Sequence, residues 1–152
     1  MNILEQIKSK FGDRVEIFEK SKQRVYINVA KEDAKPVVRY LYQDLGARMS
    51  IATGVDTRSA IEILYHMALD GEGLMLSVRA RVAKPELEME SFTDFMGAAD
   101  WIEREIHEMF GVNFSGHPHL KTLLLPDDWP EGVYPLRKKT FESEKENAER
   151  IE

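Results

Sequence analysis

Four side chains in the last third of the sequence are of types that bind metal ions. Glu103 and His107 stand four positions apart in a segment of helical periodicity. His117 and His119 follow on either side of Pro118. One carboxylate and three imidazoles are typical ligands of zinc and non-haem iron. The spacing matches no dedicated motif, because a metalloprotease helix places its Glu beside the first His and a second His four residues on.

A small metal-dependent hydrolase built on Glu103, His107, His117 and His119 is therefore the alternative function. The competing interpretation needs no metal ion. In that interpretation His107 lies on a helix surface, and His117 lies in a turn and bonds to backbone.

The same segment carries a dense group of charges, namely Glu103, Arg104, Glu105 and Glu108. Paired carboxylates can act as general acid and base. However, the sequence places no nucleophile, Gly-rich phosphate loop or Ser–His–Asp arrangement beside them. Asp100 and Arg104 are spaced for an ion pair worth roughly 0.3 kcal/mol on an exposed helix. We therefore expect these charges to form a solvent-facing side of a helix.

A helix ending at Phe110 must position these residues. Apolar residues recur every three to four positions from Phe95 to Phe110, and Gly111 follows directly. Ser91 and Asp94 have the spacing of a capping box, which predicts that the helix opens there. Gly97 would then lie inside the helix.

The preceding residues predict a sheet and two more helices. Helices are expected at residues 2–11 and 31–45, each followed by a glycine. Alternating apolar residues predict strands near residues 15–17, 25–29, 49–53, 61–67 and 74–82. Turns are expected at Ser21–Gln23, Thr53–Asp56 and Asp70–Gly73. The predicted class is α+β: a two-layer domain with a mixed, mainly antiparallel sheet of about five strands, helices on one face, and an extended C-terminal segment.

Composition limits the classes of function. Of the 152 residues, 43% are hydrophobic and 32% charged, which predicts a single globular domain at 1–141 and a charged tail at 142–152. The net charge of −6, with no basic stripe, argues against nucleic-acid binding. The lack of cysteine excludes disulfides, thiol chemistry and Fe–S clusters ligated by this chain alone. No apolar run approaches the ~20 residues of a membrane span, so a cytoplasmic location is expected.

The segment after Gly111 is rich in residues that interrupt regular structure. Pro118, Pro126, Pro130 and Pro135 punctuate it, so its backbone cannot pair in a regular ladder. Its large amphipathic side chains, together with the preceding Trp101, are of the kind that anchors protein interfaces. Its arginine offers a bidentate donor to a partner carboxylate. The large side chains after Gly111 are Trp129 and Tyr134, and the arginine is Arg137.

A longer pattern now becomes visible. Glu103-Arg104-Glu105 is followed after two residues by Glu108-Met109-Phe110, then after six by His117, after three by Lys121 and after one by Leu123-Leu124. This pattern resembles the signature of the 30 kDa subunit of respiratory complex I and of its counterpart in related membrane-bound [NiFe]-hydrogenases. It continues through Leu125–Trp129 and Pro135–Lys138. Looser matches upstream are Thr53–Asp56, Tyr65-His66 and Ala99–Trp101.

The resemblance implies a non-catalytic assembly subunit of a peripheral, cytoplasm-facing arm, with no cofactor of its own. Its implied partners are the large (49 kDa or hydrogenase large-like) subunit and the small Fe–S subunit, so it would meet the membrane only through the complex. The insertion Pro130–Tyr134 favours the membrane-bound hydrogenase type over the NADH:quinone oxidoreductase type. The segment from Gly116 to Lys139 is expected to be the main docking surface, with Arg137 as an anchor. The implied signature and interface residues are Glu103, Arg104, Glu105, Glu108, Gly116, His117, Pro118, Lys121, Trp129, Tyr134, Pro135, Arg137 and Lys138.

Overall fold

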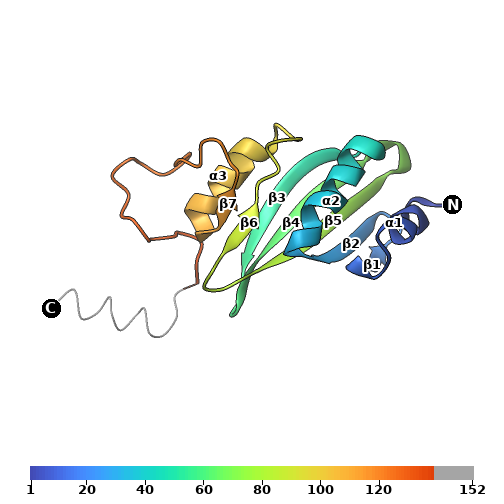
Figure 1. The fold of residues 1–152 in the computed structure, drawn as a ribbon, viewed down its shortest axis with the longest axis horizontal. Coiled ribbons are helices and arrows are strands. Elements are labelled where there is room, and N and C mark those ends of the chain that lie inside the picture. Colours follow the sequence, from blue (N-terminus) through green and yellow to red (C-terminus); the bar gives the residue numbers. More distant parts are fainter. Residues whose placement is uncertain (139–152) are drawn as a thin grey trace.

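The computed structural model describes residues 1–138, and a five-stranded sheet forms its centre (Figure 1). The spatial order of strands is β1 (Val15–Ser21), β2 (Arg24–Ala30), β5 (Leu74–Ala83), β4 (Ala60–Leu69) and β3 (Arg48–Asp56). Strands β2 and β5 are parallel, and all other neighbours in this sheet are antiparallel. The predicted mixed, mainly antiparallel sheet of five strands is confirmed.

Three α-helices accompany the sheet: α1 (Ile3–Phe11), α2 (Lys31–Arg39) and α3 (Ala99–Phe110). Short helical turns lie in the connections: η1 (Gly12–Arg14), η2 (Tyr40–Asp44) and η3 (Asp70–Glu72). Asn2 caps α1 through a capping box with Glu5, which satisfies two backbone groups at the helix start. The first two helices lie together over one end of the sheet, and α3 lies toward the other end (Figure 1).

Alternation along the central strands separates the two faces of the sheet. In β4, Ile61, Ile63 and Met67 are fully buried under the helices, in register with buried residues of β5. Because successive side chains point to opposite faces, Arg79 and Arg81 of β5 lie on the face without helices. The core therefore sits in one layer between the sheet and the helices, which confirms the α+β class.

The turn predicted at Thr53–Asp56 is wrong. Strand β3 continues through these residues to Asp56 and pairs with β4 along its whole length. Gly54 occupies a strand position because the ring of Phe110 lies where a side chain would be: a Cβ built on Gly54 would meet Phe110 Cε2 at 2.5 Å. Here the glycine permits close approach of a helix rather than a turn.

The predicted start of the last helix is also wrong. Helix α3 begins at Ala99, with Ala98 as a cap that lacks a side-chain hydrogen bond. Gly97 therefore precedes the helix. The Ser91 hydroxyl does not cap the helix start but donates to Glu103 in the middle of the helix. A two-stranded parallel sheet, which no sequence pattern predicted, is formed by β6 (Glu88–Glu90) and β7 (Asn113–Ser115), which flank α3 in sequence.

No helix within residues 1–138 has both the length and the apolar character that crossing a membrane requires. The charged tail expected at residues 142–152 and the domain boundary at 141 lie outside the described part of the chain.

Candidate functional site

The carboxylate of Glu103 is buried in the domain rather than presented to solvent. Its side chain is 0% exposed. Its two oxygens accept hydrogen bonds from the Ser91 hydroxyl at 2.6 Å and the Phe92 amide at 2.7 Å. Burial raises the pKa of Glu103, and these two hydrogen bonds oppose that rise. Glu103 therefore fastens α3 to the segment that precedes it.

A second buried carboxylate, Glu108, holds the chain on the other side of the helix. It accepts hydrogen bonds from the amides of Leu123 and Leu124 at 2.9 and 2.8 Å, and from that of Leu125 at 3.4 Å. Three successive backbone donors thus converge on one carboxylate. The predicted solvent-facing role is wrong for Glu103 and Glu108, because segments far along the chain cover both.

Arg104 and His117 complete the fastening. Arg104 donates to the carbonyl oxygens of Lys121 and Thr122 at 3.1 and 2.8 Å, instead of pairing with Asp100. His117 has a fully buried side chain, and its Nε2 contacts the backbone oxygen of Asp100 at 3.1 Å and its carboxylate at 3.2 Å. The contact of His117 with the Asp100 backbone agrees with the interpretation in which His117 lies in a turn and bonds to backbone.

The four candidate metal ligands do not gather around one point. Glu103 is committed to Ser91 and Phe92, and His107 Nδ1 contacts the Val112 carbonyl oxygen at 2.8 Å. Within residues 1–138, no group of three or more His, Asp or Glu side chains is arranged to hold a metal ion. The geometry therefore does not support the metal-dependent hydrolase.

The end of the described chain lies against α3 and the sheet. Arg137 Nε donates to the Phe110 carbonyl oxygen at 2.8 Å, and its guanidinium lies over the ring of Tyr134. The backbone amide of Lys138 donates to Asp56 at 2.7 Å. Asp56 is 4% exposed and also bonds to the ammonium group of Lys84.

The pKa of Asp56 is lowered: burial alone would raise it, but the hydrogen bonds from Lys84 and Lys138 and the positive charges of Lys84 and Arg137 together outweigh burial. Sequence reasoning missed this anchor because Asp56 was placed in a turn. The presence of Asp56 in the looser upstream match was the available signal.

Tyr134 closes the end of α3. Gly111 ends this helix with φ +82°, and a Cβ there would meet the Tyr134 ring at 2.7 Å. The loop beyond forms a groove of about 380 Å³ lined by His107, Trp129, Val133 and Tyr134, among others. Trp129 Nε1 donates to the Val133 carbonyl oxygen at 2.8 Å, which fixes the indole at the rim.

The remaining predicted residues are exposed. Glu105 lies on the outer side of α3 and lines a second groove of about 200 Å³ between α3 and β3. Gly116, Pro118, Lys121 and Pro135 lie on the exposed surface of the C-terminal segment. The structure therefore brings the predicted residues together on one side of the molecule but divides them into internal fasteners and exposed groups.

Several large apolar side chains of this region are exposed. The described residues expose ten large hydrophobic side chains, five of which belong to α3 or the segment after it. They are Trp101 (67% exposed), Leu124 (63%), Leu136 (55%), Val133 (49%) and Trp129 (38%). Half of the exposed large apolar side chains in residues 1–138 thus belong to α3 and the segment after it, which makes this part of the chain the first candidate for a protein interaction site.

Comparison with curated proteins finds relatives that are named as subunits or components of dehydrogenases and hydrogenases. The chain is 36% identical over 140 residues to a component of the F(420)H(2) dehydrogenase of Methanosarcina mazei, covering 90% of this chain and 88% of that protein. It is 31% identical to membrane-bound hydrogenase subunit beta of Pyrococcus furiosus, covering 89% and 82%. It is 34% identical to hydrogenase-4 component G of Escherichia coli but spans only 25% of that longer protein.

Solved structures share the fold. A chain of the membrane-bound sulfane sulfur reductase, an archaeal respiratory membrane complex, superposes with a TM-score of 0.78 over 99% of this chain, at 24% identity. A trypsin-resistant fragment of Nqo5 superposes with a TM-score of 0.64 over 77% of this chain, at 23% identity. Residues 27–146 match the family described as the respiratory-chain NADH dehydrogenase 30 Kd subunit. This match, with the curated relatives, confirms the resemblance: the chain belongs to the complex I 30 kDa subunit family.

Proposed function

We propose that this chain is a non-catalytic assembly subunit of a complex I-like, membrane-bound oxidoreductase. It binds no cofactor and docks onto the large subunit of the complex, close to the small Fe–S subunit. Its place is the peripheral arm on the cytoplasmic face of the membrane. Family membership and relatives named as parts of F(420)H(2) dehydrogenase and membrane-bound hydrogenase support this proposal.

The docking role is inferred from exposed apolar side chains on a backbone that hydrogen bonds hold in place. We call the exposed side chains of Trp101, Leu124, Trp129, Val133 and Leu136 the docking surface. The backbone around Leu124 is hydrogen-bonded to the side chains of Glu108 and Arg104. The segment that contains Leu136 is hydrogen-bonded to α3 through Arg137. A preorganised segment loses less conformational entropy on binding, which favours a stable interface.

Arg137 has a different role in this proposal from the one the sequence predicted. Its Nε is committed to the Phe110 carbonyl oxygen, so it holds the segment in place from within. A bond from the remaining guanidinium donors to the large subunit stays a prediction. The apolar side chains, rather than Arg137, are the primary anchors.

For the subtype, we propose the membrane-bound hydrogenase type. The loop Pro130–Tyr134 supports it, and membrane-bound hydrogenase subunit beta of Pyrococcus furiosus is among the relatives, although the F(420)H(2) dehydrogenase component shares more identity with this chain. The large subunit that copurifies with the chain tests the subtype. Two Cys-x-x-Cys pairs in that subunit would support the hydrogenase type, and their absence would contradict it.

A capture assay tests the docking role. Trp101→Gln and Leu136→Ser should each weaken retention of the large subunit by ~10-fold or more, because large apolar anchors dominate interface energies. The melting temperature of the isolated chain should stay nearly unchanged, because both side chains are largely exposed. Phe18→Ser is the matched control, since Phe18 is 58% exposed on β1, away from the docking surface. Equal retention of all three variants would refute the proposed surface.

A further inference from the structure

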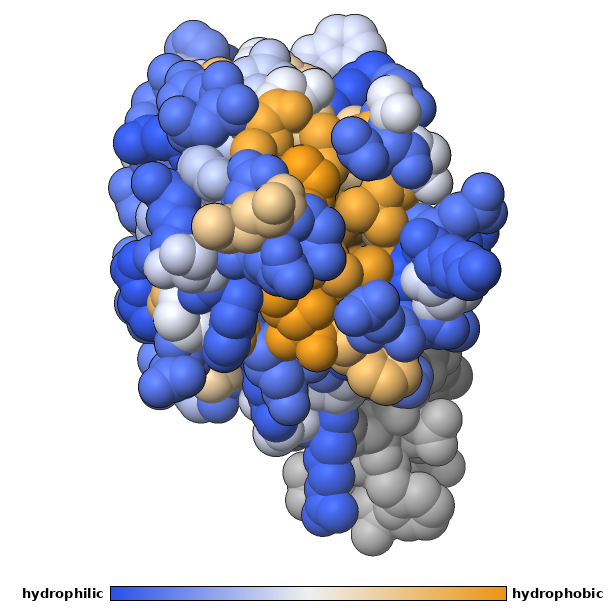
Figure 2. All heavy atoms as spheres, turned by 90° about the vertical axis from the view of Figure 1, so that its right-hand side faces the viewer, coloured by the Kyte–Doolittle hydropathy of each residue, from blue (hydrophilic) through white to orange (hydrophobic). Residues whose placement is uncertain are grey.

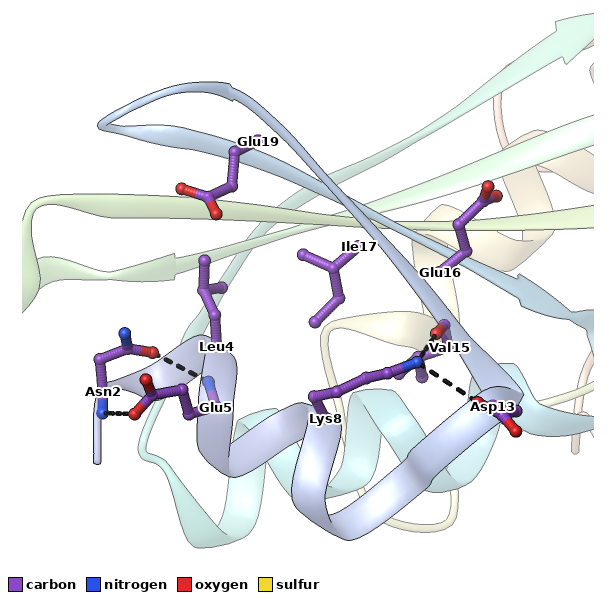
Figure 3. A pocket seen from close by; sticks show the side chains of 9 residues that line it. All are labelled: Asn2, Leu4, Glu5, Lys8, Asp13, Val15, Glu16, Ile17 and Glu19. Atoms are coloured by element: carbon purple, nitrogen blue, oxygen red, sulfur yellow. Dashed lines mark hydrogen bonds and ion pairs between the residues drawn. The ribbon is translucent and has the colours of Figure 1, made fainter.

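A groove runs between helix α1 and the edge strand β1, at the end of the sheet opposite the docking surface (Figures 1 and 3). Its volume is about 770 Å³. Leu4 of α1 and Ile17 and Glu19 of β1 point into the space between the two elements (Figure 3). Viewed from the side that carries α1, the molecule shows a strip of hydrophobic residues bordered by hydrophilic ones (Figure 2). Leu4 and Ile17 are partly buried apolar residues, so the groove has an apolar floor.

The backbone of β1 faces this groove with groups that β2 does not use. Strand β1 lies at the edge of the sheet and pairs only with β2. The Val15 carbonyl oxygen accepts a bond from Lys8 Nζ at 3.2 Å, so the polar groups of Val15 point away from β2. In an antiparallel pair the bonding direction alternates from residue to residue. The N–H and C=O groups of Ile17 and Glu19 therefore also point outward, whereas those of Phe18 point to β2.

The charges around the groove are mainly negative. Its lining includes four carboxylates, from Glu5, Asp13, Glu16 and Glu19, and one ammonium group. Glu5 already accepts a hydrogen bond from the Asn2 amide and Glu16 accepts one from Asn28. That ammonium, from Lys8, is already engaged by two carbonyl oxygens and by Asp13. In the part of the chain from 1 to 138, the Glu19 side chain takes part in no hydrogen bond or ion pair.

We propose that this groove binds an extended, basic segment of a partner protein, which adds to β1 as a sixth strand. The open N–H and C=O groups of Ile17 and Glu19 would pair with the partner's backbone, as in other cases of strand addition. An apolar side chain of the partner would rest on Leu4 and Ile17. The partner residues two positions before and after that apolar residue lie on the same face of the added strand. These two residues would be Lys or Arg and would lie near Glu19 and Glu5.

The charge pattern selects this occupant over a second copy of the chain. A second copy would bring the same acidic groove lining to the shared edge, and each chain carries a net charge of −6, so like charges would face one another across the pairing. A basic strand meets the same carboxylates with opposite charge. The site is separate from the docking surface and does not depend on the proposed function.

The test uses a labelled peptide, Thr-Lys-Thr-Ile-Thr-Lys-Thr, whose Ile and Lys side chains share one face of a strand. We expect it to bind the full chain with a dissociation constant below about 1 mM, measured by fluorescence anisotropy. The amide resonances of Ile17 and Glu19 should shift on titration, and that of Phe18 should shift less. Replacing both Lys residues of the peptide by Glu, or N-methylating its three central amides, should abolish binding.

A charge reversal in the protein provides the second arm. Glu19→Lys should weaken peptide binding by at least about tenfold, because it juxtaposes like charges at the groove. Glu32→Lys, at an exposed position on α2, is the matched control and should change binding less than about twofold. Failure of the peptide to bind, equal binding to the Glu19→Lys variant, or tolerance of N-methylation would each overturn the proposal. So would self-association of the chain through β1, seen by sedimentation, because a second copy would then occupy the edge.

Discussion

The charged residues of α3 act as fasteners for the backbone rather than as an acid–base pair. Glu103 and Glu108 lie on the same helix, yet each carboxylate receives hydrogen bonds from a different distant segment. Sequence reasoning could identify them as unusual but could not predict their burial. The periodicity of a helix predicts only the apolar side that packs on the sheet. In α3, other sides of the helix are also covered, by the segments around Phe92 and Leu124.

Replacing Glu108 should loosen the loop that it holds. Glu108→Ala removes the acceptor of up to three backbone amides, and unpaired buried donors cost about 1–3 kcal/mol. We expect the free energy of unfolding to fall by about that amount. Amide hydrogen exchange at Leu123 and Leu124 should accelerate by at least ~10-fold. Glu105→Ala on the exposed side of the same helix is the control, and similar exchange in both variants would contradict this role.

At the scale of elements, the predictions succeeded where the sheet alone determines the pattern. The central strands and the first helix were found with nearly their observed bounds, such as the helix expected at 2–11 and observed at Ile3–Phe11. The edge strands β1 and β3 extend well beyond the residues predicted for them. The capping box failed because Ser91 bonds to Glu103, twelve positions along the chain. The strands β6 and β7 were missed because three residues are too few to show an alternating pattern.

Gly54 gives a direct test of how α3 packs on β3. Gly54→Ala would place a Cβ 2.5 Å from Phe110 Cε2, so the ring or the helix must move. Overpacking of this kind costs about 1–3 kcal/mol, which chemical denaturation would measure. The double variant with Phe110→Leu should recover part of the loss. Gly97→Ala has no atom within 4 Å of the new Cβ and should change stability little. Equal stability of the Gly54 and Gly97 variants would show that the contact is not rigid.

At the scale of the whole molecule, the sheet carries two separate surfaces at its opposite ends. The docking surface lies on α3 and the C-terminal segment, and the acidic groove lies between α1 and β1. The family match and the fold were predictable because the signature residues and the alternating strands are local in sequence. The proposed docking surface falls largely within the segment from Gly116 to Lys139 that the sequence indicated. The groove beside β1 could not be placed from sequence, because it depends on which strand forms an edge of the sheet.

Asp56 links the sheet to the end of the described chain, and this link should depend on pH. The carboxylate bonds to Lys84 and to the backbone amide of Lys138. The pKa of Asp56 is lowered below its ordinary value of 3.8, because these hydrogen bonds and the positive charges of Lys84 and Arg137 together outweigh the effect of burial. A carboxyl with a lowered folded-state pKa contributes stability above its unfolded pKa. That contribution is lost as pH falls through the folded-state value.

Asp56→Asn should therefore destabilise the chain at neutral pH by about 1–3 kcal/mol, since Lys84 loses its charged partner. The difference in unfolding free energy between the parent and the variant should stay constant above about pH 5 and shrink as pH falls below 3.8.

Exchange of the Lys138 amide hydrogen should be faster in Asp56→Ala, which removes the acceptor altogether, than in Asp56→Asn, whose amide oxygen can still accept. Asp70→Asn breaks an exposed pair with Arg48 and should have a much smaller effect, because solvent screens that pair. A difference between parent and Asp56→Asn that does not change from pH 7 to pH 3 would mean that the Asp56 charge contributes nothing to holding the segment against the sheet.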